Sequence, residues 1–99
     1  MLLGTKPHTA GNHKLFKIDY SNWLPDGVSL STATVVLSAA FTATVTDVTI
    51  SNVVTLPSHH VSFMLIGGSV NETFTLDVQV TDSRGETKND TVGFRVVAP

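Results

Sequence analysis

The chain has 99 residues and a formal net charge of −2, with its six Lys and Arg scattered along the sequence. A nucleic-acid-binding surface needs a basic stripe that displaces counterions from phosphates, so we expect no nucleic-acid partner. The absence of cysteine excludes disulfides and thiolate metal sites, and it fits folding in a reducing cytosol. The length is typical of one domain, and 41% apolar against 14% charged residues indicates a folded chain.

The first twelve residues mix Gly, Thr, Pro, His and Asn without periodicity. We interpret residues 1–12 as a flexible N-terminal arm that orders only against something else, with simple fraying as the alternative. The folded domain is then residues 13–99, and removal of the arm is expected to leave its melting temperature nearly unchanged. The candidate interface residues in this arm are Met1, Leu2, Leu3, Lys6, Pro7 and His8.

The apolar run at the start is too short for a signal peptide or a membrane span. We therefore expect a complete, soluble reading frame without a membrane partner.

The first strand is expected at residues 14–20, followed by a turn at residues 25–27, where Pro, Asp and Gly each favour turn geometry. Trp23 is the single Trp, which we interpret as a core residue, with an interface anchor as the alternative.

The middle of the chain is rich in β-branched residues, which suit a pleated, half-buried surface. The pattern predicts strands at residues 28–37, 43–50, 53–56 and 60–66. A turn is expected at residues 51–52, and a proline ends the short third strand of this group.

The last part of the chain has the clearest pattern. Residues 73–81 alternate strictly between apolar and polar side chains, and alternation resumes at residues 91–96 after a Gly-containing turn. Two such runs predict an antiparallel hairpin with one buried face. Short strands with regular turn signals indicate an all-β fold, an immunoglobulin-like β-sandwich of about seven antiparallel strands, with a small β-barrel as the alternative.

The residues with catalytic or metal-binding chemistry do not form a known site. His59 and His60 are adjacent, so on a strand they point to opposite faces and cannot chelate one ion. The sequence lacks a G-x-S-x-G nucleophile turn. Four acidic residues cluster near the last hairpin, and we interpret them as solvated turn residues rather than a calcium site: Asp77, Asp82, Glu86 and Asp90. We predict that the protein is not an enzyme and uses no metal or cofactor.

The sequence DYSNWLPDG at residues 19–27, followed by VSLSTATV at residues 28–35, resembles small structural proteins of tailed bacteriophages. These carry a D-Y-S-x-W-L-x-D-G-x-x-I-x-x-A block, and later a Gly-Gly loop, here Gly67 and Gly68, and a final hairpin. The group is the phage fiber-tail adaptor proteins, and the resemblance covers about residues 14–97. In this chain Leu30 replaces the more usual Ile of the block.

The resemblance implies a virion component that is assembled in the bacterial host cytoplasm and binds by protein–protein contacts. Its partners would be fibers or neighbouring tail proteins, with several copies in a ring about the tail. One alternative is a capsid decoration (cement) protein that binds the major capsid protein of the phage head. A carbohydrate-binding module is a third reading, although one Trp, one Tyr and five Phe leave few aromatics once a core is filled.

Overall fold

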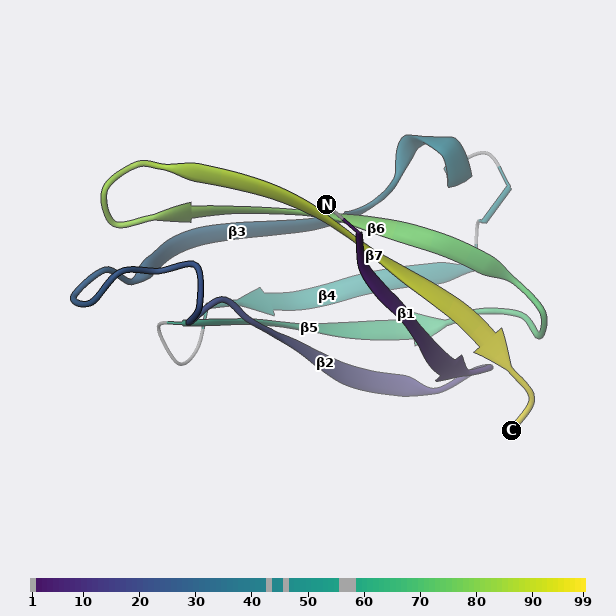
Figure 1. Ribbon diagram of the computed structural model, residues 1–99. Helices are drawn as coiled ribbons and strands as arrows, with labels where there is room; N and C mark the ends of the chain where they lie inside the picture. The colour runs from purple at the N-terminus through teal and green to yellow at the C-terminus, as the bar shows by residue number, and fades with distance from the viewer. Residues whose placement is uncertain (1, 43, 46, 56–58) are drawn as a thin grey trace.

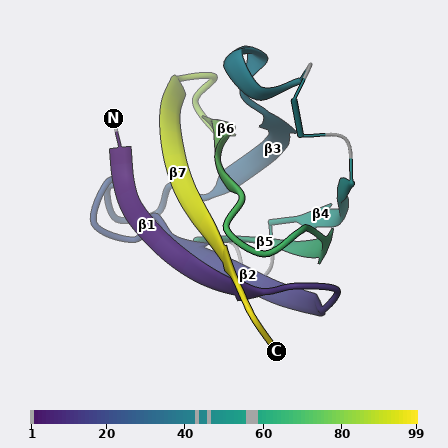
Figure 2. The same cartoon turned by 90° about the vertical axis from the view of Figure 1, so that its right-hand side faces the viewer.

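In the computed structural model, which describes residues 2–42, 44–45, 47–55 and 59–99, two β-sheets pack face to face (Figures 1 and 2). One sheet has the strand order β1-β7-β6-β3 and the other β2-β5-β4. Because the two sheets remain separate throughout the described residues, the β-sandwich prediction is confirmed over the barrel. The elements are β1 (Leu2–Thr9), β2 (His13–Asp19), β3 (Leu30–Leu37), the 3-10 turn η1 (Ala39–Phe41), β4 (Val48–Val54), β5 (His60–Gly67), β6 (Thr73–Asp82) and β7 (Thr87–Val97).

The predicted C-terminal hairpin is β6 and β7, and its alternating residues supply seven of the sixteen buried hydrophobic residues among those described. Phe74, Leu76 and Phe94 are each no more than 1% exposed, as the period-two pattern requires. Phe94 meets the opposite sheet at Phe16, with ring centroids 4.8 Å apart in an edge-on arrangement. It also packs edge-on to Phe63 at 6.3 Å. Aromatic pairs of this kind contribute about 0.5–1.5 kcal/mol each beyond the area they bury.

The N-terminal segment is part of the sandwich, which corrects the prediction of a flexible arm over residues 1–12. Strand β1 pairs with β7 in parallel, with Thr5 opposite Gly93 and Thr9 opposite Val97, so the strands are also not all antiparallel. The local sequence gave no sign of this, because Pro7 and the positive-φ Gly4 interrupt any period-two pattern. Such residues are tolerated at a sheet edge, where the strand is held from one side by its neighbour.

His8 fixes the end of β1 to the second sheet. The side chain is only 1% exposed, and its Nε2 lies 2.9 Å from the carbonyl oxygen of Gly67 at the end of β5. The ring also packs against Phe16, with centroids 6.0 Å apart. The N-terminal strand is therefore held both by its ladder to β7 and by this contact between the sheets.

The predicted turns, the strands in the middle of the chain and the position of Trp23 have different outcomes. Residues 51–52, predicted as a turn, lie within β4, where the pairing with β5 shifts between Ser51 and Val54. One irregular strand thus replaces the two expected at 43–50 and 53–56, whose residues 43, 46 and 56 lie outside the described residues. The turn at residues 25–27 is confirmed, since Gly27 has a φ of 80°. Trp23 is partly buried against the core, beside the ring of Tyr20.

Deletion of residues 1–9 is expected to destabilise the domain, because it uncovers the edge of β7 and removes the buried His8 contact. A loss of two kcal/mol or more would lower the melting temperature by about 8 °C or more in a domain of this size. Thermal unfolding followed by circular dichroism measures this. Lys6→Ala, at an exposed position of the same strand, serves as the control and should change stability by less than about 0.5 kcal/mol. An unchanged melting temperature for the deletion would contradict the assignment of β1 to the fold.

Candidate functional site: the outer face of the four-stranded sheet

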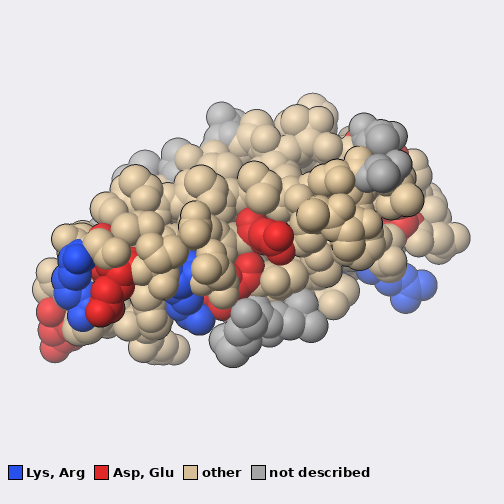
Figure 3. Space-filling view, turned by 90° about the horizontal axis from the view of Figure 1, so that it is seen from above, with Lys and Arg blue, Asp and Glu red and all other residues tan. Residues whose placement is uncertain are grey.

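The outer face of the four-stranded sheet is rich in small hydroxyl side chains. Because side chains alternate along β6 and β7, those next to the buried residues face outward. Figure 3 looks onto this face: charged side chains gather towards the β6–β7 turn at the left, and uncharged residues cover most of the right-hand half. The outward residues of the two central strands include Thr73, Thr75, Asp77, Gln79 and Thr81 on β6, and Thr87, Asn89, Thr91, Gly93 and Arg95 on β7.

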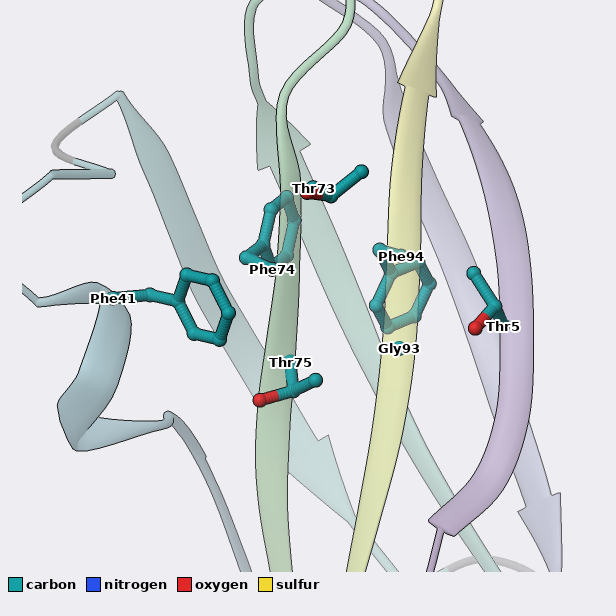
Figure 4. A pocket seen from close by; sticks show the side chains of 7 residues that line it. All are labelled: Thr5, Phe41, Thr73, Phe74, Thr75, Gly93 and Phe94. Atoms are coloured by element: carbon teal, nitrogen blue, oxygen red, sulfur yellow. The ribbon is translucent and has the colours of Figure 1, made fainter.

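A depression of about 280 Å³ lies over β6 and β7. Figure 4 shows the side chains around it: Phe41, the last residue of η1, stands on one side of the two strands and Thr5, on β1, on the other. Its walls therefore come from parts of the chain that are far apart in sequence. The lining residues are Thr5, Phe41, Thr73, Phe74, Thr75, Gly93 and Phe94.

Gly93 allows β1 to close one side of the depression. A Cβ atom at this position would lie 2.8 Å from Thr5 Oγ1, closer than non-bonded atoms approach. Any other residue at position 93 would push Thr5 away and change the shape of this side. The glycine therefore permits the close approach of β1 rather than an unusual backbone conformation.

A hydrogen-bonded chain fixes the opposite side. The hydroxyl of Thr75 donates to Ser38 Oγ at 2.7 Å, and Ser38 Oγ in turn donates to the carboxylate of Asp77 at 2.6 Å. The backbone N–H of Ser38 also donates to the carbonyl of Thr75 at 3.0 Å. These bonds anchor the start of η1 to β6, so Phe41 is held in place and the depression is already formed without a partner.

The interface residues predicted from the sequence differ in how far they are exposed in the structure. Met1 lies outside the described residues, and for Leu2 and Leu3 only the backbone in β1 is described. Lys6 and Pro7 are exposed on β1, near the depression. His8 is buried within the chain, so as a binding residue it is corrected to a core residue. Sequence reasoning missed Thr5 and Gly93, because only the parallel pairing brings them together.

Asp82 was expected to be solvated, and this is wrong: the residue is 1% exposed. Its carboxylate accepts hydrogen bonds from the Arg84 guanidinium at 2.8 and 3.1 Å and from the backbone N–H groups of Arg84 and Glu86. Although burial raises the pKa of Asp82, the hydrogen bonds from Arg84 and the two backbone groups hold it below its ordinary value. The carboxylate therefore organises the β6–β7 turn.

Asp90 is also buried, at 2% exposure, and it joins the two sheets. It accepts a hydrogen bond from the hydroxyl of Tyr20, which follows β2, at 2.9 Å. Lys88 Nζ lies 3.0 Å from the other carboxylate oxygen. Burial, together with the bond to Asp90, raises the pKa of the Tyr20 phenol well above its ordinary value. Both buried acids thus have structural partners.

The two adjacent histidines lie at the start of β5. His59 is exposed at the end of the loop before β5, and His60 Nε2 lies 3.7 Å from Asp19. Within the described ranges, no group of three or more His, Asp or Glu side chains is arranged to hold a metal ion. In the same part of the chain, no helix is long and apolar enough to cross a membrane.

Comparison with known protein families identifies the family of this β-sandwich. The family model described as podophage GP4 fiber-tail adaptor protein gp77 matches residues 9–95, nearly the whole chain. The chain belongs to this fiber-tail adaptor family. The resemblance seen in the sequence is thereby confirmed, and the adaptor is a structural protein of the phage tail.

Other comparisons add the fold alone. No curated protein matches the adaptor. Among solved structures, a 2,6-sialyltransferase of Photobacterium sp. JT-ISH-224, in a ternary complex with CMP and lactose, is similar with a TM-score of 0.54 and 14% identity. The match covers the whole of the adaptor but only 18% of the sialyltransferase chain. At this identity the likeness concerns the sandwich and not the reaction.

Replacement of Tyr20 by Phe is expected to destabilise the adaptor by about 1.5–3 kcal/mol, the usual contribution of a hydrogen bond to a charged group. The change removes one hydroxyl and leaves a buried oxygen of Asp90 without that donor. Urea unfolding measures the effect. In a double-mutant cycle with Asp90→Asn, the Tyr20 substitution should cost less, and additive losses would show that the bond does not couple the two sheets.

Acid unfolding is expected to depend on Asp82. Because its pKa is lower in the folded state than in the unfolded chain, the stabilisation is present above the unfolded value of about 3.9 and is lost as pH falls through the folded value. The urea midpoint of the wild type should therefore fall steeply below about pH 4. Asp82→Asn should lower the urea midpoint at neutral pH and make it depend less on pH below about 4. If the midpoint of the variant falls as steeply with pH as that of the wild type, other groups control acid unfolding.

Proposed function

We propose that the adaptor joins the phage tail to its fibers or to neighbouring tail proteins through protein–protein contacts made by the outer face of its four-stranded sheet. The observation that carries this proposal is the preformed depression between β1 and η1. The family match supports a role in the tail, and the depression offers a place where a partner side chain can be held. The adaptor then works by binding alone, without catalysis.

The lining of the depression suits an apolar anchor with a polar neighbour. Phe41 provides the exposed aromatic surface, because Phe74 and Phe94 are each 1% exposed and turn their rings into the core, and three Thr side chains stand at the border. A buried anchor gains about 25 cal/mol for each Å² of apolar surface removed from water. Such central anchors carry most of the binding free energy of an interface, and a rigid site loses little entropy on binding.

Lys6 and Pro7 are proposed as the rim of this contact, since both are exposed on the strand that forms one wall. We further propose that several copies surround the tail and that they are assembled with it in the host cytoplasm. The partners are then other virion proteins, such as fibers and tail proteins.

The carbohydrate-binding alternative is not favoured by the structure. All seven aromatic residues lie in the described ranges: five are buried, and Trp23 and Phe41 are partly buried against the core. A sugar platform needs exposed rings on which a pyranose can stack. The head-decoration alternative differs in copy number, since a cement protein is present in many more copies per particle than a tail component.

Thr73→Trp is expected to reduce incorporation of the adaptor into phage particles by about tenfold, because the indole would fill the depression from its border (tenfold corresponds to about 1.4 kcal/mol). A phage that lacks the gene would be complemented with wild type or variant, and adaptor copies per purified particle would be counted by quantitative mass spectrometry. Gln79→Trp, at an exposed outward position of the same strand but away from the depression, is the matched control.

Equal incorporation of both variants, with unchanged melting temperatures, would contradict docking at the depression. The wild-type count tests the broader proposal: tens of copies fit a tail adaptor, and hundreds would favour the head-decoration alternative.

A further inference from the structure

The sandwich has four edge strands among the described residues, β1 and β3 in one sheet and β2 and β4 in the other. Edge strands present unpaired backbone groups, and proteins usually protect them against pairing with other chains. Strand β1 contains Pro7, and β4 has irregular pairing between Ser51 and Val54. On β2, Lys14 shares the inward phase of Phe16, with its Nζ 5.6 Å from the ring centroid. Three of the four edges thus carry protective features.

Strand β3 is different. Its sequence LSTATVVL has no charged residue and no proline, and it is rich in β-branched residues. Its register with β6 shifts once, at the start of the strand between Leu30 and Thr32, and is regular from Thr32 to Leu37, so the protective irregularity does not extend to this part of the edge. Val36 on this strand is 55% exposed, although its β-branched apolar side chain is suited to a covered sheet surface. The strand therefore has the properties of one that accepts a further strand.

The hydrogen bonding identifies the groups that face the open edge. The N–H of Ser38 donates to the carbonyl of Thr75, so these opposed residues form a hydrogen-bonded pair. In an antiparallel ladder such pairs alternate with non-bonded ones, so Val36 and Thr34 also turn their backbone groups towards β6. Ala33 therefore directs its N–H and C=O away from β6, towards the edge of the sheet.

We propose that the edge of β3 at Ala33 accepts an extended segment of another tail protein as a fifth strand of the sheet. Backbone bonds to Ala33 would give the added strand its register, and its outward side chains would cover Val36. An uncharged, β-branched segment is the complementary chemistry, because β3 itself offers no charge. The inference rests on the proposed function, since the segment belongs to a docking partner.

The position of β3 supports a partner rather than a second adaptor copy. Strand β3 leads directly into η1, whose Phe41 forms one wall of the depression. One partner can therefore place a strand on the edge and an anchor in the depression.

Ala33→Pro tests the edge directly. Proline removes the N–H that faces the edge and places its ring there, but it leaves the bonds between β3 and β6 in place. Val36→Lys is a second variant, which puts a charge beside the added strand at an exposed position. Lys17→Pro is the matched control on β2: because Tyr20 N–H bonds to His59, the N–H of Lys17 points away from β5.

In the complementation assay, both β3 variants are expected to lower adaptor copies per particle by about tenfold relative to Lys17→Pro, with melting temperatures close to that of the wild type. Hydrogen exchange on wild-type particles should also show slower exchange for a peptide spanning residues 31–37 than in the free adaptor. Wild-type counts for Val36→Lys, or unchanged exchange of this peptide, would overturn the proposal.

Two outcomes separate this inference from the proposed function. If the wild-type adaptor is absent from particles, the proposed function itself is contradicted. If the wild type and both β3 variants are incorporated equally well, only the proposal for the β3 edge is contradicted. Sedimentation of the free adaptor tests whether a second adaptor copy, rather than a partner protein, pairs with the edge of β3. A concentration-dependent dimer that Ala33→Pro abolishes would assign the edge to a second copy and overturn the partner named here.

Discussion

The contact of Phe94 with the opposite sheet is the interaction on which the rest of the structure depends. Its ring lies against Phe16 and Phe63 of the three-stranded sheet and stacks on Phe74 of its own. The preceding residue, Gly93, faces the outer side of β7, and because it has no side chain β1 can approach closely there. One position of β7 thus joins the layers on the inside, and the adjacent position shapes the candidate docking depression on the outside.

Polar contacts complete this arrangement at its ends. Asp82 organises the β6–β7 turn through Arg84, Asp90 joins β7 to the segment after β2, and His8 joins β1 to the end of β5. Each is a side chain of low exposure with a defined partner, so removal of a partner leaves a polar group buried at a cost in stability. Two of these contacts account for Asp82 and Asp90, buried acids of the charged cluster near the last hairpin.

Much of the fold could be predicted from local patterns, and the exceptions have physical causes. The alternation of β6 and β7 is visible in the sequence because one face of each strand is buried and the other is wet. Strand β1 lacks that pattern, because an edge strand is fixed by its ladder to β7 rather than by a row of apolar side chains. The burial of Asp82 was missed for a related reason: turn residues are usually solvated, and only the fold shows that Arg84 and the backbone enclose it. The depression could not be predicted at all, since Thr5, Phe41 and Gly93 meet only in three dimensions.

The central claim is that the adaptor docks as a preformed sandwich through the outer face of its four-stranded sheet. A cryo-EM map of the assembled tail tests it most directly. The account predicts density of a neighbouring protein over β6 and β7, with a side chain in the depression beside Phe41 and the two sheets packed as in the isolated chain. A map in which that face is open to solvent and the contacts are made by the three-stranded sheet would contradict it.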